Sequence, residues 1–340
     1  MGKTSIEWCE DSENPIRVIE EDGGGWWCEP ISPGCDNCYA SALNQFRGNG
    51  RTYGNGDRPR LYLDRDLLAR WARQTKPRRH FVASMTDIFG SWIPQNWLFE
   101  ILDAMAAAHR QTFLMLTKWA LRMRLVVSRW LEARGLEELP PNIWPCATVE
   151  NQIFADKRIP ELLKIPARCH GLSIEPLLEA LHLWPSWLQL ELQAFGGGNA
   201  RLFPRIDFAM VGGESGQTDA VRPLHPHRVE ALRDQCLNFG VRFFFKQWGA
   251  WAPLCLASDC RWEELEDFWP ETRDLIAVDL DGKIFQRRLK GQWESHGHPP
   301  EDAFWFVRVG KKYSGRLLNG AFWNQSLLWD PEKEEVVRID

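Results

Sequence analysis

The sequence predicts an α/β protein built on a partial (β/α) barrel of parallel strands. From about Pro77 to Phe245, short apolar runs alternate with longer segments in which apolar residues recur at helical spacing. Strands that alternate with helices are joined by right-handed crossovers into a parallel sheet. Several runs are apolar throughout, which is typical of strands covered on both faces. A doubly wound sheet is the alternative, although no Gly-x-Gly-x-x-Gly motif opens a helix after the first strand.

The predicted elements follow one another in a regular order. Strands are expected at 80–84, 112–116, 143–148, 169–174, 208–211 and 241–245. Helices are expected near 97–105, 121–131, 153–163 and 229–237. The second of these helices is expected to bury one apolar face, made of Leu121, Leu125, Val126, Trp130 and Leu131.

Two flanking regions and one insertion complete the predicted organisation. Residues 1–60 are rich in Gly, Pro, Asn and Cys, and we expect a loop-rich, cluster-binding part of the barrel domain with one helix near 39–46. Residues 61–250 form the barrel core, and the segment at about 178–204 is read as an insertion between two strands. Residues 251–340 are predicted to be a small mixed α/β appendage, in which Asp281-Gly282 marks a hairpin turn.

Composition limits the class of protein. The chain has 340 residues, of which 44% are apolar and 26% charged, as in ordinary globular proteins. A formal charge of −5 excludes an overall basic surface of the kind that binds nucleic acid, but it is compatible with a local basic patch. The sequence holds no long apolar stretch and begins without the apolar core of a signal peptide, so we expect a cytoplasmic protein with no membrane span. In that reducing compartment, close Cys spacing indicates metal or redox chemistry.

Ionisable groups follow almost every predicted strand. These residues are Asp87, Lys118, Glu150, Glu175, Glu214 and Lys246, joined by Ser173 and the glycines Gly212 and Gly213. Because chemistry gathers at the carboxyl edge of a parallel sheet, we expect them to converge there. The alternative is that they are caps or structural ion pairs. The run from Gly212 to Gly216 is not a phosphate-binding loop of the Walker type. It either lets a ligand approach the backbone or forms a plain tight turn.

Three cysteines near the start are the most informative local feature. Cys28, Cys35 and Cys38 have the spacing Cys-x6-Cys-x2-Cys, with a Pro33-Gly34 turn before the second. Three thiolates satisfy three irons of a [4Fe–4S] cube and leave the fourth iron open. Structural zinc needs four ligands, for which Cys9 is a candidate, and three unligated thiols are the remaining reading.

The other cysteines are scattered along the chain, and we read them as buried small hydrophobes. They are Cys146, Cys169, Cys236, Cys255 and Cys260.

Several short blocks, in order, resemble the phage Gp37/Gp68 family of three-Cys-motif, DUF5131-like proteins. The blocks lie at 3–8, 31–40, 57–61, 84–87, 116–118, 173–177, 211–216, 244–249 and 308–312. The resemblance runs to about Gly320. Members of that family resemble radical S-adenosylmethionine (SAM) enzymes, which carry three cysteines ahead of a partial barrel. Here the first cysteine gap is six residues instead of three, and Gly212-Gly213-Glu214 follows a late strand instead of an early one.

The resemblance implies an iron–sulfur enzyme that uses SAM. Cys28, Cys35 and Cys38 would hold [4Fe–4S], and reductive cleavage of SAM would give a 5′-deoxyadenosyl radical that abstracts hydrogen from the substrate. The residues implied to bind SAM are Glu150, Ser173, Glu175, Gly212, Gly213 and Glu214. The candidate catalytic residues are Asp87, Lys118 and Lys246, of which the lysines would hold a carboxylate or phosphate. The implied partners are an electron donor such as flavodoxin or ferredoxin and a nucleobase, nucleotide or DNA substrate.

A second hypothesis belongs to a different class. The protein would be a non-catalytic nucleic-acid-binding module, whose zinc or iron–sulfur centre only orders the N-terminal loops. A basic group would then contact phosphates while tryptophans stack on bases. That group is Arg58, Arg60, Lys76, Arg78 and Arg79, for which a solvated helix end is the plainer reading.

Overall fold

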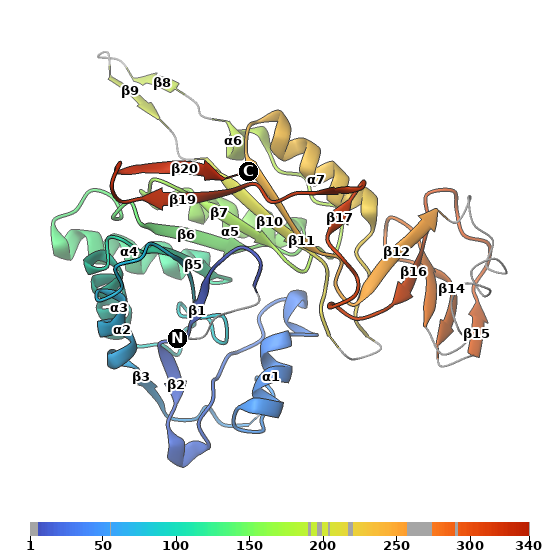
Figure 1. The fold of residues 1–340 in the computed structure, drawn as a ribbon, viewed down its shortest axis with the longest axis horizontal. Coiled ribbons are helices and arrows are strands. Elements are labelled where there is room, and N and C mark those ends of the chain that lie inside the picture. Colours follow the sequence, from blue (N-terminus) through green and yellow to red (C-terminus); the bar gives the residue numbers. More distant parts are fainter. Residues whose placement is uncertain are drawn as a thin grey trace.

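The computed structural model describes residues 6–54, 56–189, 192–195, 199–202, 205–216, 220–256, 274–289 and 292–339. Its centre is one sheet of seven parallel strands (Figure 1). The strands are β1 (Asp11–Glu13), β4 (Arg79–Val82), β5 (Thr112–Thr117), β6 (Ile143–Thr148), β7 (Gly171–Ile174), β10 (Phe208–Gly212) and β11 (Arg242–Gln247). Their spatial order is their order along the chain, whereas a doubly wound sheet reverses order at a switch point. The predicted partial (β/α) barrel is confirmed.

Helices cover the outer face of this sheet (Figure 1). They are α2 (Arg65–Trp71), α3 (Gln95–Ala107), α4 (Ala120–Arg134), α5 (Gln152–Leu162) and α7 (Pro226–Asn238). Alternate strand residues such as Phe113, Leu172 and Phe243 pack against them, because successive side chains of a strand point to opposite faces. The main core therefore lies between the sheet and the helices.

The predicted buried face of α4 is partly wrong. Leu121 and Leu125 are 54% and 42% exposed. The buried stripe also includes Met123 and Val127, which continue the three- and four-residue spacing through Trp130. The two leucines lie beside this stripe, on the solvent side of the helix.

The inner face of the barrel is filled at the amino ends of its strands. Side chains such as Phe81, Trp144 and Phe208 point inward and form a second core. The hairpin of β19 (Ser326–Asp330) and β20 (Glu335–Ile339) lies across them and adds Leu327 and Trp329 to this core (Figure 1). The C-terminal hairpin thus closes one end of the barrel, and a pocket lies at the other end.

The N-terminal segment holds more strands than predicted. β1 was not expected, because Asp11-Ser12-Glu13 has no apolar pattern, yet it pairs with β4 at one edge of the sheet. β2 (Ile16–Val18) pairs with β3 (Leu61–Leu63), and α1 (Tyr39–Arg47) matches the predicted helix.

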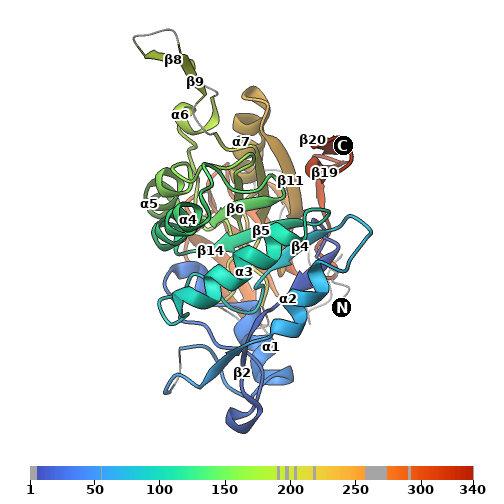
Figure 2. The ribbon, with the colours of Figure 1, turned by 90° about the vertical axis from the view of Figure 1, so that its left-hand side faces the viewer.

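The remaining elements lie outside the barrel. Within the insertion, β8 (Leu192–Phe195) and β9 (Asn199–Leu202) form a hairpin that projects from the body of the protein beyond α6 (Pro185–Leu188) (Figure 2). An antiparallel sheet contains β12 (Trp251–Leu256), β13 (Leu275–Val278), β14 (Ile284–Leu289), β15 (Gln292–Ser295) and β16 (Phe304–Arg308). The predicted turn at Asp281-Gly282 joins β13 to β14. A short hairpin follows, made of β17 (Leu317–Leu318) and β18 (Ala321–Phe322). The domain limits at 60 and 250 stay predictions.

No helix among the described residues combines the length and apolar character needed to cross a membrane.

Candidate functional site

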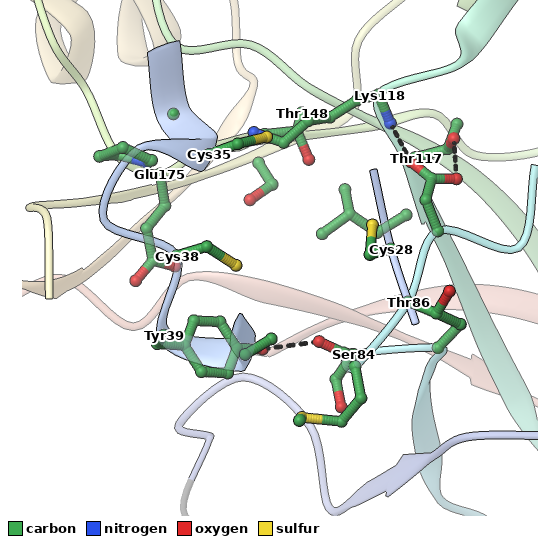
Figure 3. A pocket seen from close by; sticks show the side chains of 18 of the residues that line it. Cys28, Cys35, Cys38, Tyr39, Ser84, Thr86, Thr117, Lys118, Thr148 and Glu175 are labelled. Atoms are coloured by element: carbon green, nitrogen blue, oxygen red, sulfur yellow. Dashed lines mark hydrogen bonds between the residues drawn. The ribbon is translucent and has the colours of Figure 1, made fainter. Parts of the chain in front are cut away.

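One pocket at the carboxyl edge of the barrel brings most of the predicted site residues together (Figure 3). They are Cys28, Cys35, Cys38, Asp87, Lys118, Ser173, Glu175, Gly213, Glu214 and Lys246. The other two predicted residues lie just outside the pocket wall. Glu150 is buried behind it, and Gly212 packs against the side chain of Glu175.

The three cysteines come from one loop that covers the pocket. Cys28 lies outside the helices and strands, Cys35 ends a short 3-10 turn (Pro33–Cys35), and Cys38 directly precedes α1. Their side chains surround the same space (Figure 3). Burial raises the pKa of the Cys28 thiol, and Asp87 and Cys38 raise it further. Burial also raises the pKa of Cys38. Because their pKa values are raised, these thiols ionise to thiolates readily only when a positive charge such as a metal ion lies beside them.

The donor set fits an iron–sulfur cluster. Three half-buried thiols share one pocket, which is the number of thiolates that leaves one iron of a cube open. In the described part of the chain, no three His, Cys, Asp or Glu side chains lie close enough to hold a single metal ion. Cys9, the proposed fourth zinc ligand, is 5% exposed and packs with Trp8 and Phe81 in the inner core.

The scattered cysteines are mostly as expected. Cys146, Cys169 and Cys236 are buried and free. Cys255 departs from the prediction, because it is half-buried on β12 of the antiparallel sheet and is disulfide-bonded. Cys260 lies outside the described residues.

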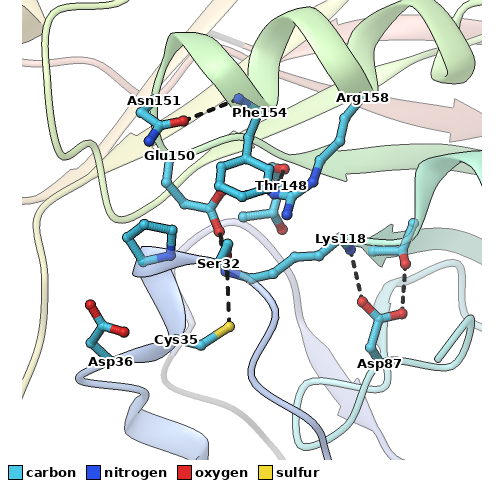
Figure 4. A network of polar contacts seen from close by, with 12 residues as sticks. Ser32, Cys35, Asp36, Asp87, Lys118, Thr148, Glu150, Asn151, Phe154 and Arg158 are labelled. Carbon is cyan, nitrogen blue, oxygen red and sulfur yellow. Dashed lines mark hydrogen bonds and ion pairs between the residues drawn. The ribbon is translucent and has the colours of Figure 1, made fainter. Parts of the chain in front are cut away.

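Glu150 is the centre of a buried ionic network beside Cys35 (Figure 4). Its carboxylate accepts hydrogen bonds from the Ser32 hydroxyl at 2.5 Å, from Lys118 Nζ, and from the Arg158 guanidinium at 2.7 Å. Burial raises the pKa of Glu150, but Lys118 and Arg158 outweigh it and hold the pKa below its ordinary value. Glu150 is therefore a fully partnered, ionised carboxylate with no exposed surface.

Asp87 fixes the backbone next to Lys118. Its carboxylate accepts from the Thr117 hydroxyl at 2.6 Å, the Lys118 backbone N–H at 2.8 Å and the Phe89 backbone N–H at 3.0 Å. Burial raises the pKa of this carboxyl. These bonds set the direction in which the Lys118 side chain leaves β5.

Glu214 contacts the cysteine loop from another side. It accepts from Asn37 Nδ2 at 3.1 Å and from the Arg222 backbone N–H at 2.8 Å, and it pairs with the Arg222 guanidinium. Arg222 also donates to the Pro33 carbonyl at 2.8 Å and contacts Asp36 at 3.5 Å. Glu214 is 5% exposed, so this carboxylate is also buried and partnered.

Glu175 has a different environment. Its carboxylate pairs with Lys246 Nζ at 2.6 and 2.8 Å and accepts from Gln247 Nε2 at 3.0 Å. Its side chain is 22% exposed, and it faces the pocket together with Ser173 and Lys246. This is the pair of opposite charges that a ligand in the pocket can reach.

Close packing explains Gly213 but restricts Gly212 only weakly. A Cβ at Gly213 would lie 2.1 Å from the Trp248 carbonyl oxygen, and one at Gly212 would lie 3.3 Å from the Glu175 carboxyl carbon. A side chain at Gly213 would collide with the backbone that directly follows β11, whereas the obstacle at Gly212 is a flexible side chain. The plain tight turn is thus sufficient to account for Gly213.

The sequence reasoning missed two arginines. Arg158 and Arg222 pair with Glu150 and Glu214, and each follows its glutamate by eight residues. The repeated Glu-x7-Arg spacing after two strands was the available signal.

The predicted basic patch is largely paired with acidic groups. Arg60 binds Asp22, Arg78 binds Asp11, and Arg79 binds Glu10. Three of the five proposed phosphate contacts therefore already have carboxylate partners.

Fold and site together define a partial parallel barrel with a cysteine-lined pocket at its carboxyl edge. The chain belongs to the DUF5131 family of proteins of unknown function, whose model matches residues 3–326. This confirms the DUF5131 part of the family prediction, and the phage Gp37/Gp68 designation stays a prediction. No curated protein sequence matches the chain.

Two solved structures are similar to this chain at low identity. One is a cysteine-to-serine mutant of spore photoproduct lyase, with a TM-score of 0.39 and 10% identity over 73% of this chain and 78% of that chain. The other is a double mutant of spore photoproduct lyase with bound AdoMet and dinucleoside spore photoproduct. Its TM-score is 0.36, with 13% identity over 88% of this chain and 74% of that chain.

Proposed function

We propose that this protein is a radical-SAM-like iron–sulfur enzyme. The observation that carries the proposal is the convergence of three thiols and a ring of polar strand ends on one pocket of a partial parallel barrel. Cys28, Cys35 and Cys38 would hold a [4Fe–4S] cluster. When bound, the cluster and SAM supply a 5′-deoxyadenosyl radical for hydrogen abstraction.

The polar side of the pocket would orient SAM. Glu175 and Lys246 present a carboxylate and an ammonium side by side, which complements the zwitterionic amino-acid end of SAM. Thr148 and Ser173 add hydroxyl groups to the same wall. Lys246 is also our candidate for contacting a carboxylate or phosphate of the substrate. Asp87 and Lys118, predicted as catalytic, would act through the network that they form with Glu150.

The apolar side of the pocket would exclude water. Trp8, Phe81 and Leu116 line it, and the Tyr39 hydroxyl donates a hydrogen bond to the Ser84 carbonyl at 3.1 Å. Exclusion of water protects a reactive intermediate from side reactions. A nucleobase, nucleotide or DNA substrate, a flavodoxin or ferredoxin as electron donor, and a cytoplasmic location complete the proposal.

Anaerobic purification followed by iron and sulfide assay tests the cluster. Incubation with SAM and dithionite, with detection of 5′-deoxyadenosine, tests the chemistry. Brown protein that yields 5′-deoxyadenosine supports the proposal. Colourless protein with one bound zinc would refute it and favour the nucleic-acid-binding module.

A further inference from the structure

We propose that Glu150 and Glu214 are positioning residues, which hold the Ser32–Cys38 turn against the barrel and do not bind SAM. This inference rests on the proposed function only for the identity of the group that the thiols hold. The contacts of the turn with the barrel carry the argument.

A glutamate lies just after each of three neighbouring strands. Glu150 follows β6, Glu175 follows β7 and Glu214 follows β10, and these strands are adjacent in the sheet. The middle carboxylate faces the pocket, with 22% of its side chain exposed. The outer two side chains are 0% and 4% exposed, and both oxygens of each carboxylate already accept hydrogen bonds from protein groups.

The first outer carboxylate holds the start of the turn. The Ser32 hydroxyl donates to Glu150, accepts from Lys118 Nζ at 3.2 Å, and lies 3.7 Å from the Cys35 sulfur. A Cβ at Gly34 would lie 2.5 Å from Glu150 Cγ. The turn therefore packs directly on the glutamate, one residue before the cysteine.

The second outer carboxylate holds the end of the turn. Asn37 lies between Cys35 and Cys38 and donates to Glu214. Arg222, which Glu214 orients, donates to the Pro33 carbonyl. Each carboxylate also has an arginine partner, so neither is left as an uncompensated buried charge.

Thiol reactivity in the metal-free protein tests this role without any cofactor. The reduced protein is treated with N-ethylmaleimide, and tandem mass spectrometry follows each of the three cysteines separately. Ser32→Ala and Asn37→Ala each remove one hydrogen bond to a buried carboxylate. Because bonds to charged groups are stronger than neutral ones, we expect the modification rate of Cys35 to rise about tenfold.

Controls separate a released turn from general unfolding. Cys28 lies outside the turn, so its rate is expected to stay within about twofold of wild type. Ser32→Thr keeps the hydroxyl group, so Cys35 in this variant is expected to be modified at the slow wild-type rate. Glu161→Gln removes a carboxylate of α5 that pairs with Arg124 and Lys164 away from the loop, and it leaves Cys35 unchanged. If the barrel-side variants Glu150→Gln and Glu214→Gln fail to fold, the loop-side variants still decide the question.

The results distinguish this inference from the proposed function. An unchanged Cys35 rate in Ser32→Ala and Asn37→Ala overturns the positioning role. An unchanged rate together with weaker SAM binding by Glu150→Gln or Glu214→Gln overturns it in favour of SAM ligands. A faster Cys35 rate in a protein that takes up no iron or sulfide supports the positioning role while refuting the iron–sulfur enzyme.

Discussion

Gly213→Ala is expected to destabilise the fold, because the position lies against the backbone of Trp248, directly after the next strand. The added Cβ would lie 2.1 Å from the Trp248 carbonyl oxygen, whereas ordinary contacts begin at 3.4 Å, so the segments that follow β10 and β11 must separate by about 1.3 Å (3.4 − 2.1). Two hydrogen bonds of 2.9 Å cross this junction, from Gly213 N–H to the Gln247 carbonyl and from Ala250 N–H to the Glu214 carbonyl. Overpacking costs about 1–3 kcal/mol and the two weakened hydrogen bonds about 1 kcal/mol each, so we expect a loss of about 3–5 kcal/mol.

Urea denaturation followed by tryptophan fluorescence measures this loss. Gly212→Ala is the matched control, because its nearest obstacle is the end of a flexible glutamate side chain at 3.3 Å, and we expect it to cost about 1 kcal/mol or less. The reasoning is refuted if the free energy of unfolding of Gly213→Ala lies within about 0.5 kcal/mol of the wild-type value. Retained stability with a loss of SAM binding would show that the glycine serves a ligand and not the fold.

Three further predictions concern other parts of the molecule. Burial lowers the pKa of His170 to about 4, so its contribution to stability is complete above pH 6.5 and is lost as the pH falls toward 4. The unfolding free energy of the wild type, relative to that of His170→Gln, should therefore decrease by about 3 kcal/mol between pH 6.5 and pH 4. Trp329→Ala should lower the free energy of unfolding by about 3–5 kcal/mol in the same urea assay, since this side chain fills the inner face of the barrel, and a loss below about 1 kcal/mol would contradict that role. Cys9→Ser should leave bound iron and sulfide at wild-type levels while Cys38→Ser reduces them, and equal losses would place Cys9 among the ligands.

The central strands were predictable because burial on both faces makes them apolar throughout. Ile143–Thr148 was expected with both of its limits, and its residues are buried along the whole length. β1 could not be predicted in this way. It lies at the sheet edge, and its Asp11 and Glu13 are buried beside charged neighbours such as Arg78, an arrangement that only the tertiary structure provides.

The position of the candidate site was also predictable, since parallel strands present their carboxyl ends at one edge. The roles of the individual carboxylates were not. Glu150, Glu175 and Glu214 each follow a buried strand, and only the arginine eight residues after Glu150 and Glu214 sets these two apart in sequence. Their difference arises from the cations that the fold brings to them, and Arg158 reaches Glu150 only because α5 folds back over β6.

The balance of charge around the pocket explains why so many ionisable groups gather beside three thiols. Asp87 and Glu150 face Lys118 and Arg158, so this network has no net charge when all four groups are ionised. In the proposed metal-bound state, three thiolates would add negative charge to the same pocket, and each unpaired carboxylate nearby would raise the cost of forming them. The cations therefore have two effects at once. They neutralise the carboxylates that contact the cysteine turn, and they would let the pocket accept the charge of the proposed thiolate-bound cluster.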